Sequence, residues 1–243
     1  MNLRRDVARA VDEAADPSTP LERLRVLAVH DSRVVRAAVA ARRPLSRELA
    51  EQLREDDAWQ VRFALIPAAE GDPERQLMLA ASTDKWMRAI LAEVPGLSIE
   101  AQRILAGDEF SETVGRIAKN TRDRALYDEL MLDPRPRVRG FCAWNDALCT
   151  ADDARRLARD RSSVARASAV HRPELDESDL IELARDRSAS VQWQVIATRP
   201  SSRAALEIIA REGDDVNALH ARRALESLDA VARHHDLPDG AGA

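Results

Sequence analysis

The sequence predicts an all-α fold, a solenoid of about eight two-helix repeats of about 26 residues each. Three observations predict it: a helix-forming composition, a 26-residue period of aliphatic residues, and a turn rich in Pro, Ser or Thr before each unit. The 243 residues include 43 Ala, 26 Leu and 35 Arg, but only 3% are aromatic. Ala, Leu and Arg favour helices, so this composition disfavours a β-sandwich or barrel.

The strongest signal is a column of large aliphatic residues at intervals of 26. Its eight members are Leu27, Leu53, Leu79, Leu105, Met131, Leu157, Leu183 and Ile209. Two units begin with the same hexapeptide LARDRS, in LARDRSSVARASAV from Leu157 and LARDRSASVQWQVI from Leu183. A unit of this length holds two short helices, and neither buries its apolar face alone. Successive units must therefore stack to form a continuous core.

Each unit is expected to contain the same elements in the same order. In the first unit, a turn at 16–20 leads to a first helix at 21–28, where Leu24 and Leu27 share one face. A short acidic turn at 30–32 follows, and a second helix begins near Val34. Equivalent turns precede the later units at 42–46, 171–175 and 198–202. This order places the recurring arginines in the second helix and the recurring acids in the turn before it.

The ends of the stack need helices that cover the exposed core. Residues 1–15 predict an N-terminal capping helix, because Leu3, Val7, Val11 and Ala14 fall on one face. Repeats are expected over 16–220 and a C-terminal capping helix over 221–233. The remaining 234–243 ends in LPDGAGA and is expected to be disordered.

The segment DPSTPLERLRVLAVHDSRVVRAAVAARRP (residues 16–44) resembles the leucine-rich repeat variant (LRV) family, which is related to HEAT-like α-solenoids. The resemblance extends over roughly residues 16–225 and is weakest at 93–135. It implies a right-handed superhelix in which α-helices alternate with short α- or 3-10 helices. The founding type carries an N-terminal cysteine cluster for an iron–sulfur centre. Here no Cys precedes Cys142, so that function is not implied.

Charge and cysteine content limit the class of partner and the cellular compartment that we expect. Lys and Arg total 37 against 42 acids, a net charge of −5, which disfavours a general nucleic-acid binder. Two cysteines cannot form a disulfide framework. The N-terminus lacks the apolar stretch of a signal peptide, and no apolar run approaches the length of a membrane span. We therefore expect a cytoplasmic, monomeric protein that does not contact a membrane.

An arginine recurs in the second helices, preceded by a turn acid. The arginines are Arg36, Arg62, Arg88 and Arg139, and the acids are Asp31, Asp57, Asp84 and Asp133. One interpretation is an arginine stripe that binds phosphate or carboxylate groups. The favoured interpretation is a structural ladder, in which each Arg pairs with an acid of its own or an adjacent unit, because the acids recur with the arginines.

A neighbouring column varies from unit to unit. It contains Ala37, Phe63, Ala89, Arg116, Gly140, Arg166, Trp193 and Ala218. Variation on a constant scaffold is typical of a ligand-facing column, and of a solvated column that tolerates any residue. Aromatic and Arg side chains often anchor interfaces, so Phe63, Arg116, Arg166 and Trp193 are the partner-binding candidates.

The sequence contains no motif that predicts catalysis. No nucleophile, phosphate-loop or metal-ligand motif is present, and Cys142 and Cys149 lack a nearby His. We expect no cofactor, no metal and no enzyme activity. The leading hypothesis is a module that binds a protein or peptide along one face of the solenoid. The alternative is a nucleic-acid-binding solenoid resembling HEAT-like DNA-repair glycosylases. It needs a concave stripe formed by some of Arg36, Arg62, Arg88, Arg116, Arg139 and Arg166.

Overall fold

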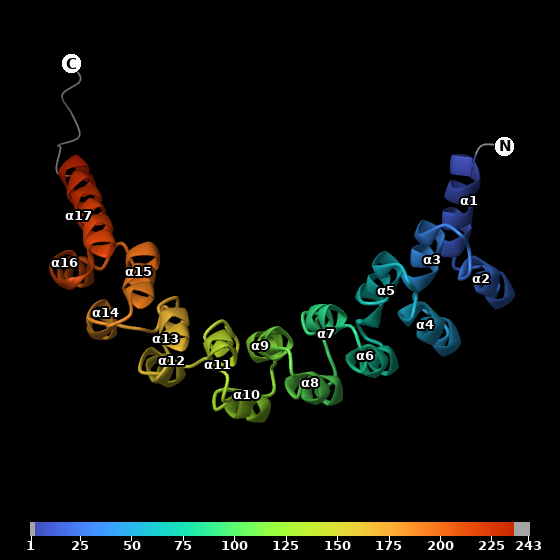
Figure 1. Cartoon of the computed structure of the whole chain (residues 1–243), viewed down its shortest axis with the longest axis horizontal. Coiled ribbons are helices and arrows are strands. Elements are labelled where there is room, and N and C mark those ends of the chain that lie inside the picture. The colour runs from blue at the N-terminus through green and yellow to red at the C-terminus, as the bar shows by residue number, and fades with distance from the viewer. Residues whose placement is uncertain (1–2, 236–243) are drawn as a thin grey trace, which may run out of the picture. The chain divides into compact units, whose positions relative to one another are not determined.

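The structure, a computed structural model, describes residues 3–235 of the chain. Over these residues it contains seventeen α-helices, one short 3-10 helix and no strand (Figure 1). The prediction of an all-α fold is therefore confirmed. The chain divides into two compact units, unit 1 at residues 1–123 and unit 2 at residues 124–243, and each is described by itself.

Unit 1 packs its helices in two layers. The helices are α1 (Leu3–Ala15), α2 (Leu21–Leu27), α3 (Arg33–Ala40), α4 (Arg47–Arg54), α5 (Trp59–Ala64), α6 (Pro73–Ala80), α7 (Lys85–Leu91), α8 (Ile99–Ala106) and α9 (Ser111–Asn120), with the 3-10 helix η1 (Pro67–Ala69) after α5. One layer contains α3 packed between α1 and α5, and α7 packed on α9. The other contains α4, α6 and α8. The starts of α2, α4, α6 and α8 are 26 residues apart.

Unit 2 has the same two-layer arrangement. Its helices are α10 (Arg124–Leu130), α11 (Pro136–Cys142), α12 (Ala151–Ala158), α13 (Ser163–Ala169), α14 (Glu177–Ala184), α15 (Ala189–Thr198), α16 (Arg203–Glu212) and α17 (Asp215–His235). Successive contacts join α11, α13, α15 and α17 into one layer, and α12, α14 and α16 into the other. In both units we call the layer with the odd-numbered helices the second-helix layer and the other the first-helix layer.

The core lies between the two layers of each unit. All eight members of the aliphatic column, which are spaced 26 residues apart, are at most 3% exposed. Short helices this rich in charge need defined starts, and side-chain caps supply them at Ser46, Asp72, Asp84 and Ser98. In unit 2, Thr150 and Asp176 each form a capping box with the acid three residues on.

The resemblance allowed α or 3-10 second helices. They are α-helices of six residues or more, and among residues 3–235 only η1 is a 3-10 helix. At the C-terminus, α17 runs without interruption from Asp215 to His235, so no turn separates the expected repeat region from a cap beginning at residue 221. Residues 236–243, most of the expected tail, lie outside the described residues.

Candidate functional site

A row of arginines connects consecutive helix pairs within each unit, and we call it the arginine ladder. Its members are Arg36, Arg62 and Arg88 in unit 1 and Arg139 and Arg166 in unit 2. In each, Nη1 donates to the backbone carbonyl oxygen six residues earlier, in the turn before its own helix. The rest of the guanidinium group reaches a carboxylate of the next helix pair, as at Arg36, where Nε and Nη2 lie 2.6 and 2.9 Å from Asp56.

The carboxylates of the ladder come from the following turn, 20 to 22 residues along the chain. They are Asp56, Asp84 and Asp108 in unit 1 and Asp160 and Asp186 in unit 2. Each of these carboxylates also accepts a hydrogen bond from the backbone N–H of the residue two positions later in the chain. Burial would raise the pKa of Asp160, but the hydrogen bonds from Arg139 and from the Ser162 N–H outweigh burial and lower that pKa.

Of the expected acids, Asp84 pairs with Arg62 and Asp57 adds to Asp56 at Arg36, whereas the carboxylates of Asp31 and Asp133 do not bind the ladder. Asp31 contacts Arg36 through its backbone carbonyl oxygen. The carboxylate of Asp57 is 93% exposed, and it lies 3.0 Å from Arg36 beside the buried Asp56. Asp133 offers its backbone oxygen to Arg139 and its carboxylate to Arg135. The ladder thus uses carbonyls of its own turn and carboxylates of the next.

The four predicted partner-binding residues have different surroundings. Arg166 is 9% exposed and belongs to the ladder through Asp186, so it is not the surface anchor that the variable column predicted. Arg116 is half-buried and pairs with Glu112 and Glu93. Phe63 is half-buried against Trp59, whereas Trp193 is 44% exposed. Only Trp193 is thus both exposed and available as an aromatic contact.

A second set of polar side chains, which the sequence analysis missed, binds helix C-termini; we call it the carbonyl clamps. Its members are Arg42, Asn120, Arg172 and Arg199. Each donates to a carbonyl oxygen 28 or 29 residues earlier, at the end of the preceding helix of the second-helix layer. A helix leaves its last carbonyls unpaired and partly negative, which favours a cationic donor. The available signal was an Arg one or two residues before Pro, in RRP, HRP and TRP.

Exposed tryptophans gather on the second-helix layer of both units. Trp59 in α5 and Trp86 in α7 are 59% and 51% exposed, and Trp144, just after α11, is 42% exposed. Trp86 packs edge-on against Phe110, with ring centroids 5.0 Å apart. The ammonium of Lys85 lies 5.1 Å from the Phe110 centroid. Trp86 is thus exposed to solvent while the neighbouring Phe110 ring holds it in position.

In unit 2 each exposed Trp meets a His from the next helix pair. Trp144 packs on His171 at 4.2 Å between centroids, and Trp193 packs on His220 at 5.0 Å. His171 also shares a hydrogen bond of 2.8 Å with Gln194. Burial, with the nearby Arg199 charge, lowers the pKa of His171. These contacts place His171 and His220 in packing between neighbouring helices.

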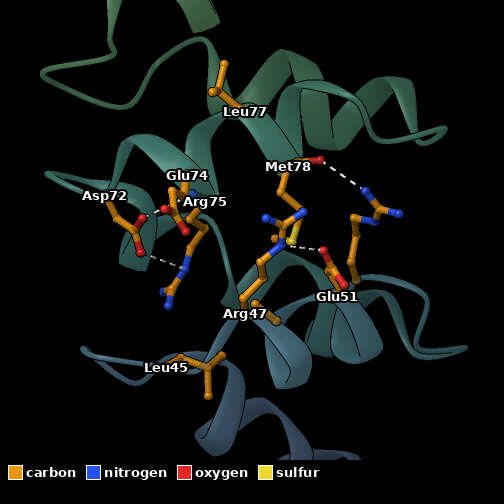
Figure 2. A pocket seen from close by; sticks show the side chains of 10 residues that line it. Leu45, Arg47, Glu51, Asp72, Glu74, Arg75, Leu77 and Met78 are labelled. Atoms are coloured by element: carbon orange, nitrogen blue, oxygen red, sulfur yellow. Dashed lines mark hydrogen bonds and ion pairs between the residues drawn. The ribbon is translucent and has the colours of Figure 1, made fainter.

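A pocket of about 350 Å³ lies in the first-helix layer of unit 1, between α4 and α6 (Figure 2). Its apolar lining is Leu45, Ala50, Leu77 and Met78, and its charged lining is Arg47, Glu51, Arg54, Asp72, Glu74 and Arg75. Arg47, Glu51 and Glu74 are exposed, but the side chain of Arg75 is 3% exposed. The pocket therefore combines an apolar body with one buried cation.

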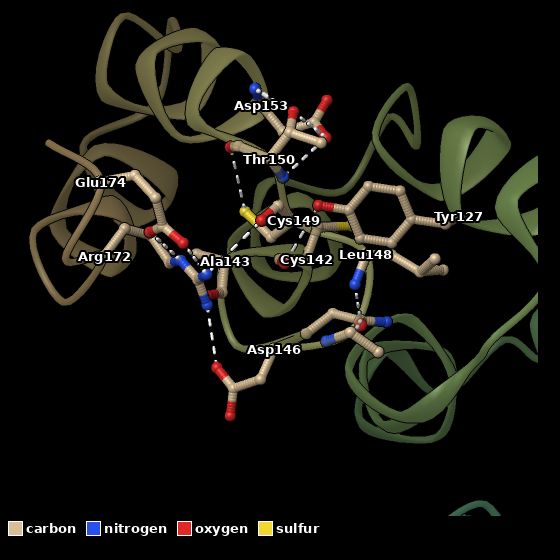
Figure 3. Close-up of polar contacts among 12 residues, drawn as sticks. Tyr127, Cys142, Ala143, Asp146, Leu148, Cys149, Thr150, Asp153, Arg172 and Glu174 are labelled. Atoms are coloured by element: carbon tan, nitrogen blue, oxygen red, sulfur yellow. Dashed lines mark hydrogen bonds and ion pairs between the residues drawn. The ribbon is translucent and has the colours of Figure 1, made fainter.

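The two cysteines belong to a buried polar cluster in unit 2 (Figure 3). The hydroxyl of Tyr127 donates to the carbonyl oxygen of Cys142 at 3.2 Å. Burial raises the pKa of both thiols, and it raises the pKa of Tyr127. Because the thiolate is the nucleophile, neither Cys142 nor Cys149 is activated for covalent chemistry.

Between residues 3 and 235, every helix is too short or too polar to cross a membrane. Within the same residues, no group of three or more His, Cys, Asp or Glu side chains is placed to hold a metal ion. In comparisons with known proteins, no family model matches the chain and no curated protein matches it in sequence.

Proposed function

We propose that this chain is a non-enzymatic interaction module, a monomeric cytoplasmic protein that binds a protein or peptide partner along its second-helix layer. The observation that carries the proposal is the segregation of exposed aromatic side chains. Trp59, Trp86, Trp144 and Trp193 all lie in or directly after helices of that layer and are 42–59% exposed. Large exposed residues of the first-helix layer, such as Val26 and Ile104, are aliphatic. Tryptophan is the residue type most enriched at interface hot spots.

The proposal includes a right-handed superhelical solenoid of about eight repeats of the LRV type. Its support is the 26-residue spacing of the first helices and the ladder that joins consecutive helix pairs within each unit. Such a framework holds the aromatic side chains in place before binding. Preorganisation lowers the entropic cost of association, which favours many modest contacts along a rigid face.

The nucleic-acid alternative is less favoured, because it needs arginines that are free to meet phosphates. Arg36, Arg62, Arg88, Arg139 and Arg166 are instead paired with aspartates of the next helix pair. Binding to duplex DNA at two salt concentrations tests this alternative. Phosphate contacts would produce an affinity that falls steeply as salt increases.

The partner hypothesis is tested by removing exposed apolar side chains from one layer at a time. The test variant is Trp59→Ser with Trp86→Ser, and the matched control is Val26→Ser with Val29→Ser, which are 55% and 65% exposed. Each variant is used as bait in lysate of the source cells, with quantitative mass spectrometry. We expect the tryptophan variant alone to lose its specific partners. Equal recovery by both folded variants would contradict the proposed face.

A further inference from the structure

Arg75 in α6 is the buried cation of the pocket between α4 and α6. The residue is 4% exposed, and its Nη1 donates to the carbonyl oxygens of Ala68 at 3.1 Å and Arg42 at 3.3 Å. Its Nε is buried and makes no hydrogen bond, and its Nη2 makes none with the described residues. One whole edge of the planar guanidinium group is thus without a hydrogen-bond acceptor.

Other buried arginines of the chain show what such an edge binds. In Arg36, Arg139, Arg166 and Arg172, Nη1 donates to backbone carbonyls, as it does in Arg75. In each of the four, Nε and Nη2 together hold one carboxylate, that of Asp56, Asp160, Asp186 and Glu174 respectively. If Arg75 follows the same hydrogen-bonding pattern, its Nε and Nη2 together bind a carboxylate.

Among residues 3–235, Asp72 is the only carboxylate paired with Arg75, and it does not fill this role. Its Oδ2 lies 3.4 Å from Nε, an ion pair without a hydrogen bond. Its Oδ1 accepts the backbone N–H of Arg75 at 3.0 Å, because Asp72 is the N-cap of α6. Burial lowers the pKa of the Arg75 guanidinium despite Asp72, so the buried charge is incompletely compensated.

The rest of the pocket fits an apolar molecule. Leu45, Ala50, Leu77 and Met78 line it, and Figure 2 shows the Arg75 guanidinium directed toward Leu45. The Arg47–Glu51 ion pair is exposed at the rim. A volume of about 350 Å³ lies within the range of pockets that hold small ligands.

We propose that this pocket binds a small organic acid with an apolar body, whose carboxylate oxygens accept hydrogen bonds from Nε and Nη2 of Arg75. The site lies in the first-helix layer, away from the exposed tryptophans, so it goes beyond the proposed function and does not depend on it. The apolar body packs against Leu45, Leu77 and Met78.

The experiment compares 3-phenylpropanoate with its uncharged amide, 3-phenylpropanamide, titrated into the ¹⁵N-labelled full chain. We expect saturable shifts of backbone amides in α4 and α6 with the acid and binding about tenfold weaker or worse with the amide. Equal binding of acid and amide, or the absence of saturable shifts at millimolar acid, would overturn the proposal.

Three variants test the geometry, and thermal melts verify their folding. Arg75→Lys keeps the charge but removes the two-donor edge, so we expect about tenfold weaker acid binding. Leu45→Trp fills the pocket and should abolish binding, and it keeps the test decisive if Arg75→Lys does not fold. Asp72→Asn keeps the cap and removes the competing charge, so it should strengthen binding. Unchanged acid affinity in folded Arg75→Lys or Leu45→Trp would refute the site, and the exposed Arg23→Gln serves as control.

Discussion

Arg139 joins two consecutive helix pairs of unit 2, because it binds Asp133 and Asp160 at the same time. Its Nη1 donates to the carbonyl oxygen of Asp133 at 2.7 Å, and its Nε and Nη2 lie 2.7 and 2.8 Å from the Asp160 carboxylate. The side chains of Arg139 and Asp160 are 7% and 12% exposed. One guanidinium group thus sets the position of a helix relative to its own turn and to the next turn.

Breaking this pair should destabilise the protein strongly. For Arg139→Ala we expect a loss of about 3 kcal/mol in the free energy of unfolding, because the Asp160 charge stays buried without its partner. Urea unfolding of the two single variants and of Arg139→Ala with Asp160→Ala gives a double-mutant cycle. The exposed pair Arg23–Glu13 is the control, and its loss should change the free energy of unfolding little, because solvent screens the two charges. A similar loss at both pairs would contradict a structural role for the ladder.

The ladder also predicts a loss of stability in acid. The folded-state pKa values of Asp160 and Asp186 are lowered, since hydrogen bonds from arginine outweigh burial. Their contribution is complete above the unfolded-state pKa of about 3.9, and it is lost as the pH falls through the lower folded-state values. Urea melts at pH 7, 5, 4 and 3 should show the decline below about pH 4. Asp186→Asn should have a shallower decline, and an unchanged slope would contradict this account.

Neighbouring residues of α8 separate core from surface. Leu105 belongs to the 26-residue column and is fully buried, whereas Ile104 is 47% exposed. Leu105→Ala should cost about 3 kcal/mol because it leaves a cavity. Ile104→Ala should cost about 0.5 kcal/mol or less. Chemical unfolding of both variants measures the difference, and equal losses would show that the column is not the core.

Gly140 allows α11 to approach α13 closely. A Cβ added at Gly140 would lie 2.8 Å from Oγ of Ser168, which is too short for an ordinary contact. Gly140→Ala should therefore lower stability by about 1–3 kcal/mol. Ser168→Ala removes the nearest atom, so it should restore part of the loss in the double variant. Thermal melts that show no such recovery would place the strain elsewhere.

The buried thiols should react slowly. Burial raises the pKa of Cys142 and of Cys149, which leaves little thiolate near neutral pH. We expect Ellman's reagent at pH 8 to label the native chain about a hundredfold more slowly than the urea-unfolded chain. Cys142→Ser and Cys149→Ser identify the reacting site. Fast labelling of either cysteine in the native protein would contradict the packing around Tyr127.

The sequence by itself determined the helical class, the position of the buried column and the approximate starts of the helices. These follow from hydrophobic periodicity, which is a local property of the chain. The recurrence of an acid in the turn before each such arginine also indicated that arginines and turn acids were paired. Residue type and spacing suffice for such conclusions, because each short helix has only one apolar face to bury.

Only the tertiary structure decided which acid meets which arginine. Arg36 makes more of its hydrogen bonds to Asp56 than to Asp57. This is because the rotation of the next turn brings the Asp56 carboxylate inward and leaves the Asp57 carboxylate in solvent. The stacking of helix pairs also buries Arg166 in the ladder and joins Arg172 to a carbonyl oxygen 29 residues earlier. It leaves one edge of the Arg75 guanidinium group facing a pocket. Contacts between residues 20 to 29 apart depend on how successive helix pairs are rotated against each other, and no local pattern encodes that angle.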